Sequence, residues 1–94
     1  MTKIRLQIHG KVQGVFYRQS ALEVAKILGL SGWIKNNPDG TVEAEAVGSP
    51  EATDKFKEWC QKGPARAVID RVETIAQEEM AVPQGETRGF RIVG

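Results

Sequence analysis

Residues 3–28 read KIRLQIHGKVQGVFYRQSALEVAKIL, and their hydrophobic period changes partway along. Every second residue from Ile4 to Ile8 is apolar, which predicts a strand with one buried and one wet face. From about residue 19 to 28 the apolar residues recur at helical spacing, and Gly29 supplies a C-terminal stop. The chain therefore begins with a strand, a glycine-containing loop and a helix.

A similar pattern returns later in the chain. Residues 32–36 and the alternating residues 41–46 predict two strands, which the turn-forming NPDG at residues 37–40 joins into a hairpin. A second helix is expected to begin after Ser49, a good N-cap, and to end at Gly63. A fourth strand with a bulge, a loop of turn formers and a short final strand are expected over residues 67–76, 79–89 and 90–93.

The element order βαββαβ plus a terminal strand predicts a single α+β domain over residues 1–94. Right-handed crossovers place both helices on one face of an antiparallel sheet, which is the ferredoxin-like α/β sandwich. A content of 40% hydrophobic residues is enough to build one sheet covered on one side. No metal or disulfide is then needed to hold the fold.

Composition restricts the class of protein. The chain has 13 basic and 12 acidic residues, and its net charge of +1 argues against a binder of nucleic-acid phosphates. Cys60, the single cysteine, cannot form an internal disulfide and favours a reducing compartment. The N-terminus alternates like a strand rather than a signal peptide, and no apolar run approaches the roughly 20 residues that span a membrane. We expect a cytoplasmic monomer that binds neither nucleic acid nor membrane.

The loop GKVQGVFYR, residues 10–18, has two interpretations. Gly10 and Gly14 allow successive backbone N–H groups to turn toward one point, and such a concavity before a helix attracts an anion. Arg18 begins the helix and carries a guanidinium that matches phosphate oxygens. A cation there opposes the helix dipole at a cost of about 0.3–1 kcal/mol unless an anion lies between them. The alternative is an ordinary turn followed by a solvated arginine.

Asn36 ends the second predicted strand. In the expected fold the first and second strands run parallel with the third between them, so their C-terminal ends lie at one edge of the sheet. Asn36 is therefore predicted to lie near the loop of residues 10–18. Its amide carries both a donor and an acceptor, which suits the orientation of a water molecule. The alternative role is an Asx-turn before Pro38.

Two stretches resemble the signature motifs of the acylphosphatase family. GKVQGVFYR at residues 10–18 is similar to G-x-V-Q-G-V-x-F/Y-R, and GWIKNNPDGTV at residues 32–42 is similar to G-W/Y/F-x-x-N-x-x-x-G-x-V. The resemblance extends over essentially the whole chain, from Ile4 to the final strand. Small departures occur at Tyr17, Ile34 and the terminal Val93-Gly94, where the family more often has phenylalanine, valine or alanine, and a nearby tyrosine or arginine.

The resemblance implies hydrolysis of the carboxyl–phosphate bond of small acyl phosphates, giving a carboxylate and inorganic phosphate, with no cofactor and no metal. The two implied catalytic residues are Arg18, which binds the phosphate, and Asn36, which orients the water. The carboxylate leaves without needing a proton, so the remaining tasks are to hold the phosphoryl group and to place the water. The implied phosphate-binding residues are Lys11, Val12, Gln13, Gly14, Val15, Phe16, Tyr17 and Arg18.

Other functions find little support in the sequence. His9 lies on a wet strand face, and one histidine cannot supply a typical zinc set. Cys60 falls on the apolar stripe of the second helix, where a thiol is structural rather than nucleophilic. A purely anion-binding domain is an alternative, although it would gain little from a water-orienting Asn36. An RNA-binding module is disfavoured, because the predicted open face carries no aromatic pair and two acidic residues, Glu43 and Glu45.

Overall fold

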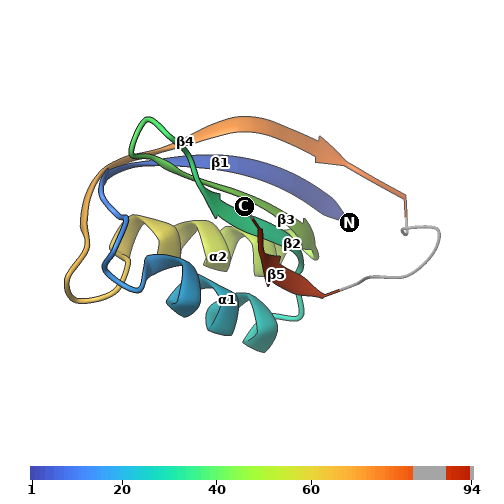
Figure 1. The fold of residues 1–94 in the computed structure, drawn as a ribbon. Coiled ribbons are helices and arrows are strands. Elements are labelled where there is room, and N and C mark those ends of the chain that lie inside the picture. The colour runs from blue at the N-terminus through green and yellow to red at the C-terminus, as the bar shows by residue number, and fades with distance from the viewer. Residues whose placement is uncertain (82–88, 94) are drawn as a thin grey trace.

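The computed structural model of the chain describes residues 1–81 and 89–93. Five strands form one sheet and two helices lie side by side against one of its faces (Figure 1). This is the predicted ferredoxin-like arrangement. The elements are β1 (Thr2–Lys11), α1 (Tyr17–Ile27), β2 (Ser31–Asn36), β3 (Val42–Gly48), α2 (Pro50–Lys62), β4 (Val68–Glu79) and β5 (Phe90–Ile92).

The strand order in the sheet is β4-β1-β3-β2-β5. β3 pairs antiparallel with both β1 and β2, so β1 and β2 run parallel on either side of it, as predicted. β4 pairs antiparallel with the other side of β1. The short β5 instead pairs parallel with the outer edge of β2, so the sheet is mixed rather than wholly antiparallel. The parallel pairing places β5 beside residues 32–34 of β2 and in contact with α1.

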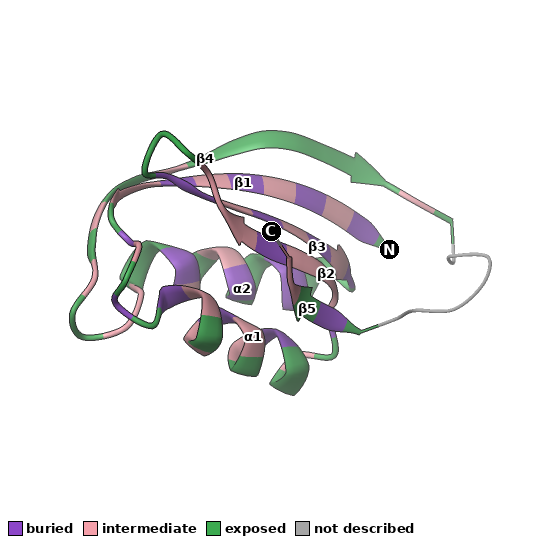
Figure 2. Ribbon diagram, in the orientation of Figure 1, coloured by how far each residue is buried: buried purple, intermediate pink, exposed green. Residues whose placement is uncertain are grey.

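Burial alternates along the strands as their sequence period requires. In β1 every second residue from Thr2 to Ile8 is buried, while the residues between them stay half-buried on the open face (Figure 2). The helices bury their inner sides against these residues. β4 is the exception, since nearly all of it is exposed along the outer edge of the sheet. The largest fully buried side chains include Tyr17, Phe56, Leu6, Ile8 and Ile34.

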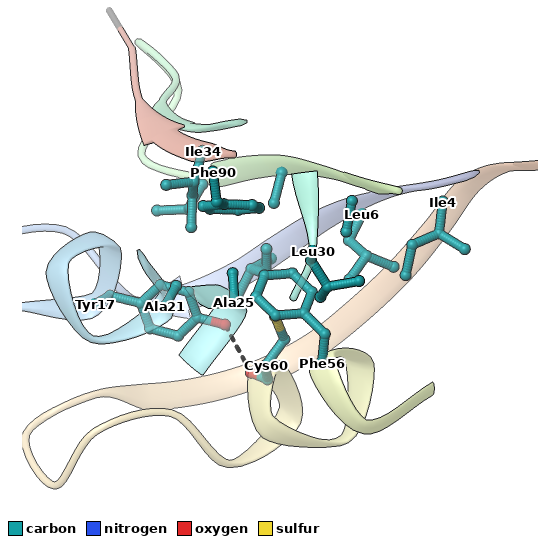
Figure 3. Packing of buried hydrophobic residues seen from close by; sticks show 14 of the residues in the cluster. Ile4, Leu6, Tyr17, Ala21, Ala25, Leu30, Ile34, Phe56, Cys60 and Phe90 are labelled. Carbon is teal, nitrogen blue, oxygen red and sulfur yellow. Dashed lines mark hydrogen bonds between the residues drawn. The ribbon is translucent and has the colours of Figure 1, made fainter. Parts of the chain in front are cut away.

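A buried hydrogen bond joins the two helices. The Tyr17 hydroxyl donates to the backbone carbonyl of Cys60 at 2.8 Å (Figure 3). Cys60 lies in the last turn of α2, and the residue four positions later is Pro64, which has no N–H to offer this carbonyl. Tyr17 therefore supplies the donor that the helix itself cannot. The same contact fixes the start of α1, where the functional loop ends.

The element boundaries largely follow the predictions. Ser49 Oγ accepts a hydrogen bond from the Ala52 N–H at 3.1 Å, so the expected N-cap of α2 is confirmed. β4 does contain irregularities, with register shifts opposite β1, but it is longer than predicted. α1 begins two residues earlier than the apolar spacing indicated. Of the predicted loop over residues 79–89, residues 82–88 lie outside the described residues.

Neither α1 nor α2 is long and apolar enough to cross a membrane, and they are the two helices in the described part of the chain.

Candidate active site

The loop between β1 and α1 is held to the core by alternate residues. Val12 and Val15 are buried. Gly14, which lies between them, and Phe16, which follows Val15, are exposed to solvent. Gly14 has φ of 74°, and a β-carbon built on it would meet no other atom within 4 Å. The need for glycine there is thus conformational, since the left-handed region costs other residues about 1–2 kcal/mol. The loop backbone can bend sharply at this point.

Gly10 has a different role from the one that the sequence indicated. It lies within β1 rather than in the loop, at a register shift opposite Ile69 of β4. Its φ is 130°, and a β-carbon on it would collide with the backbone carbonyl oxygen of Val68. Gly10 therefore permits the close approach of β4 and does not shape the anion loop. Lys11, the next residue, is the exposed end of β1.

Phe16 adopts an unusual conformation immediately before α1. It is the non-glycine residue with positive φ among the described residues, with φ of 62° and ψ of 22°, and 74% of its surface is exposed. A non-glycine residue in the left-handed region is strained by about 1–3 kcal/mol. It stays there only if the surrounding structure holds it in that conformation. Neither the core nor a cap explains this geometry, because its apolar ring faces water and Phe16 makes no side-chain capping bond.

The start of α1 is well suited to an anion. The first turn contains Arg18 and no acidic residue, so no side chain of the helix neutralises the positive end of the dipole. Arg18 is half-buried, and within residues 1–81 and 89–93 no carboxylate forms an ion pair with it. The unpaired guanidinium and the open helix end together favour negative charge at this point.

A cavity of about 300 Å³ opens beside this helix end. The structure brings together five of the predicted site residues around it: Val12, Gly14, Phe16, Tyr17 and Arg18. Ile92 of β5 also lines the cavity, and nothing in the sequence pattern had linked that residue to the site. The complete lining consists of Val12, Gly14, Phe16, Tyr17, Arg18, Gln19 and Ile92.

Asn36 ends β2, at the edge of the sheet where β1 also ends, as the topology predicted (Figure 1). It is half-buried and does not line the cavity. Its Oδ1 atom is buried and has no hydrogen-bond partner among the described residues. The Asx-turn role belongs to Asp39 instead, whose Oδ1 accepts from the Thr41 N–H at 3.0 Å. Asn37 closes the same turn through its backbone and donates from Nδ2 to Thr41 Oγ1 at 3.0 Å. Asn36 Oδ1 is thus a buried acceptor whose hydrogen-bonding potential is unused by the described residues.

Gln13 ties the two loops together. Its Nε2 donates to the carbonyl oxygens of Asn37 and Thr41, at 2.8 and 3.0 Å. One amide from the loop before α1 therefore spans the β2–β3 turn and fixes that turn next to Asn36. The sequence predicted Gln13 as part of the phosphate-binding loop, through its backbone, and did not predict these side-chain hydrogen bonds. A polar residue between two buried valines was the available signal, because its side chain has to leave the core and find partners elsewhere.

The residues considered for other chemistry lie away from this cavity. His9 Nε2 lies 2.6 Å from Glu73 Oε1 on the open face of the sheet. The pKa of the Glu73 carboxyl is lowered, chiefly by a hydrogen bond from the Arg71 side chain. Cys60 is buried, and desolvation raises the pKa of its thiol to about 12, so a nucleophilic thiolate is disfavoured. No group of three or more potential metal ligands occurs in the part of the chain that the structure describes.

The open face of the sheet pairs its charges internally. Arg5 Nη2 donates to Glu45 Oε1 at 2.9 Å and also lies near Glu43, so these acids are ion-paired rather than simply solvated. Trp33 lies on this face too, with Arg5 and Lys35 each 5.5 Å from its ring centre. A single tryptophan between two cations and two acids does not make a base-stacking platform.

Comparison with known proteins agrees with the geometry. The family model described as Acylphosphatase matches residues 4–92. A protein named acylphosphatase from Rubrobacter xylanophilus is 44% identical over 90 residues, which is 96% of this chain and 78% of that protein. One from Marinobacter nauticus is 52% identical over 73 residues, covering 78% of this chain and 77% of that protein.

The fold matches as well. The crystal structure of acylphosphatase from Bacillus subtilis superposes with a TM-score of 0.89 at 29% identity and covers 100% of both chains. The matching residues include both loops of the site, since the family model runs from β1 to the end of β5. The chain therefore belongs to the acylphosphatase family.

Proposed function

We propose that the cavity beside α1 is the active site at which this chain hydrolyses the carboxyl–phosphate bond of small acyl phosphates. Membership of the acylphosphatase family supports the reaction. The observation that carries the location is Arg18, a half-buried cation in the first turn of α1 that lines the cavity and has no carboxylate partner among the described residues. A phosphate placed there would meet both the guanidinium and the positive end of the helix.

The loop residues would contribute unequally to phosphate binding. Val12, Val15 and Tyr17 bury their side chains, so they would contribute to anion binding through backbone N–H groups. The side chain of Gln13 is already engaged with the β2–β3 turn. Lys11 is exposed at the end of β1 and would add long-range attraction rather than a fixed contact. The loop would therefore act through its backbone, and Arg18 would be the main side chain that binds phosphate.

The chemistry needs little beyond these groups. A water oxygen attacks phosphorus, the bond from phosphorus to the carboxylate oxygen breaks, and the carboxylate leaves with the electron pair. The proton of the water passes to a phosphate oxygen of the substrate. Arg18 would stabilise the charge on the phosphoryl oxygens, and Asn36 at the end of β2 would orient the water through its side-chain amide. Inorganic phosphate and the free carboxylate are the products.

Hydrolysis of benzoyl phosphate in the presence of EDTA tests the proposal. Arg18→Ala should lower kcat/KM by roughly 10³–10⁵, because an arginine in this role contributes about that much to phosphoryl transfer. Asn36→Ala should lower kcat by about a hundredfold with little change in KM, because it removes orientation rather than binding. Lys26→Ala removes an exposed cation from the last turn of the same helix and serves as the matched control. It should keep wild-type activity.

Several results would contradict this assignment. A loss below tenfold in Arg18→Ala would place the phosphate elsewhere. Activity that disappears with EDTA would refute a reaction that runs without a metal. Binding of inorganic phosphate to a wild-type protein that hydrolyses no acyl phosphate would instead support the anion-binding domain.

We also infer that the chain acts in the cytoplasm as a monomer and does not bind nucleic acid. The fully buried thiol of Cys60 suits a reducing compartment. The open sheet face satisfies its charges internally, as Arg5 does with Glu45, and so offers no surplus of positive charge to a phosphate backbone. Light scattering should give the mass of one chain, and a salt-dependent shift with single-stranded RNA would contradict the inference.

A further inference from the structure

Phe16 is the least explained residue in the site. Its large apolar ring is 74% exposed, and its backbone lies in the left-handed region, although glycine or asparagine would fit there with less strain. Neither burial nor capping compensates for these two costs. The ring borders the cavity and lies two residues before Arg18. A side chain held in this way is explained if it contacts a ligand.

The cavity lining combines charge with apolar surface. Arg18 provides one cation, whereas Val12, Phe16 and Ile92 are apolar, and they come from the loop and from β5. A volume of about 300 Å³ is at the small end of ligand sites and admits a phosphate with one ring or a short branched chain. An acyl phosphate is such a molecule, with an anionic group and a carbon substituent.

We propose that Phe16 and Ile92 form the wall that binds the acyl group, so that the preferred substrates are acyl phosphates with an aromatic or branched apolar acyl group. This inference rests on the proposed function, because it takes the phosphate to lie at Arg18. With the phosphate there, the acyl group has to leave the polar loop through the rest of the cavity. The exposed ring of Phe16 is the largest apolar surface available to it.

The test compares two substrates that share the phosphate and differ in the acyl group, benzoyl phosphate and acetyl phosphate. Phe16→Asn removes the ring while keeping a residue that tolerates a positive φ. It should lower kcat/KM for benzoyl phosphate about three- to tenfold more than kcat/KM for acetyl phosphate, the value of one aromatic contact. Phe16→Leu should recover part of the benzoyl preference. Ile27→Asn, at an exposed apolar position on α1, is the control and should change neither value.

A second readout does not depend on turnover. Calorimetry with benzylphosphonate and methylphosphonate measures the contribution of the ring to affinity in the resting protein. Wild type should bind benzylphosphonate more tightly than methylphosphonate, and Phe16→Asn should remove most of that difference. A wild-type protein that hydrolyses neither substrate would refute the proposed function, while the phosphonate difference would still decide the role of Phe16.

Two outcomes would overturn the inference. The first is an unchanged ratio of benzoyl to acetyl phosphate in Phe16→Asn. The second is an equal loss on both substrates together with weaker binding of inorganic phosphate, which would mean that Phe16 shapes the phosphate loop.

Discussion

Replacing Gln13 tests whether the two loops of the site act as one unit. Gln13 Nε2 donates to the carbonyl oxygens of Asn37 and Thr41 at 2.8 and 3.0 Å. Each carbonyl keeps a second donor in a Gln13→Ala variant, from the backbone N–H of Gly40 and of Asn37 respectively. The loss is therefore two ordinary hydrogen bonds without a stranded acceptor. At about 0.5–1.5 kcal/mol each, the free energy of unfolding should fall by about 2 kcal/mol.

Gln13→Glu should be worse than Gln13→Ala near neutral pH. A carboxylate of the same size has no N–H to donate and would face the two carbonyl oxygens with its negative charge. That repulsion favours the protonated form in the folded state. The extra destabilisation should therefore be present above the carboxyl range and decrease as the pH falls through it.

Urea unfolding followed by tryptophan fluorescence measures these differences. A loss of 2 kcal/mol should appear as a lower midpoint with an unchanged m value, and as a fall in Tm of roughly 8–16 °C. Since the bonds fix the turn beside Asn36, kcat for benzoyl phosphate should also fall, by about tenfold or more. Gln61→Ala, at an exposed position of α2, is the control. The reasoning fails if Gln13→Ala stays within about 0.5 kcal/mol of that control and keeps its kcat.

Three further predictions concern the scaffold. Gly10→Ala should destabilise the fold by about 3–5 kcal/mol in urea, because its β-carbon collides with β4, whereas Gly14→Ala should cost only about 1–2 kcal/mol; equal losses would contradict this difference. Tyr17→Phe should lower the free energy of unfolding by about 1–3 kcal/mol, because it leaves the buried carbonyl of Cys60 without its donor, and a neutral result in the same assay would contradict that role. Hydrogen bonds from the Thr41 hydroxyl and backbone N–H hold the pKa of Asp39 below its ordinary value of 3.8. The stabilisation by the Asp39 carboxylate is therefore present above pH 3.8 and is lost as the pH falls through the folded-state pKa. Asp39→Asn should therefore show a flatter acid dependence of the urea midpoint, and an unchanged dependence would refute this.

Features that depend on near neighbours in the chain were readable from the sequence. The alternation in β1, the N-cap at Ser49 and the turn at residues 37–40 were predicted and are present. Each depends on side chains a few residues apart, so the pattern itself carries the information. The position of Arg18 in the first turn of α1 is local in the same way, because the loop before it ends where helical spacing begins.

The position of Asn36, at the same end of the sheet as the end of β1, required one further step. It followed from the strand order, because the repeated strand–helix–strand unit allows few topologies and each places the ends of the first two strands at one edge. Reasoning from the strand order correctly placed Asn36 at the end of the sheet where β1 also ends. It could not give the buried, unpaired state of Asn36 Oδ1, which depends on the packing of all its neighbours.

The sequence by itself thus determined the elements, their order and the cation at the start of α1. The tertiary structure decided that Gly10 serves the contact with β4, that Gln13 spans the β2–β3 turn, and that Ile92 joins the cavity. These contacts join residues from 24 to nearly 80 positions apart, and their distances depend on sheet register and on the parallel pairing of β5. No local sequence pattern encodes the distances between these residues, because burial and hydrogen bonding between distant segments fix them only in the folded protein.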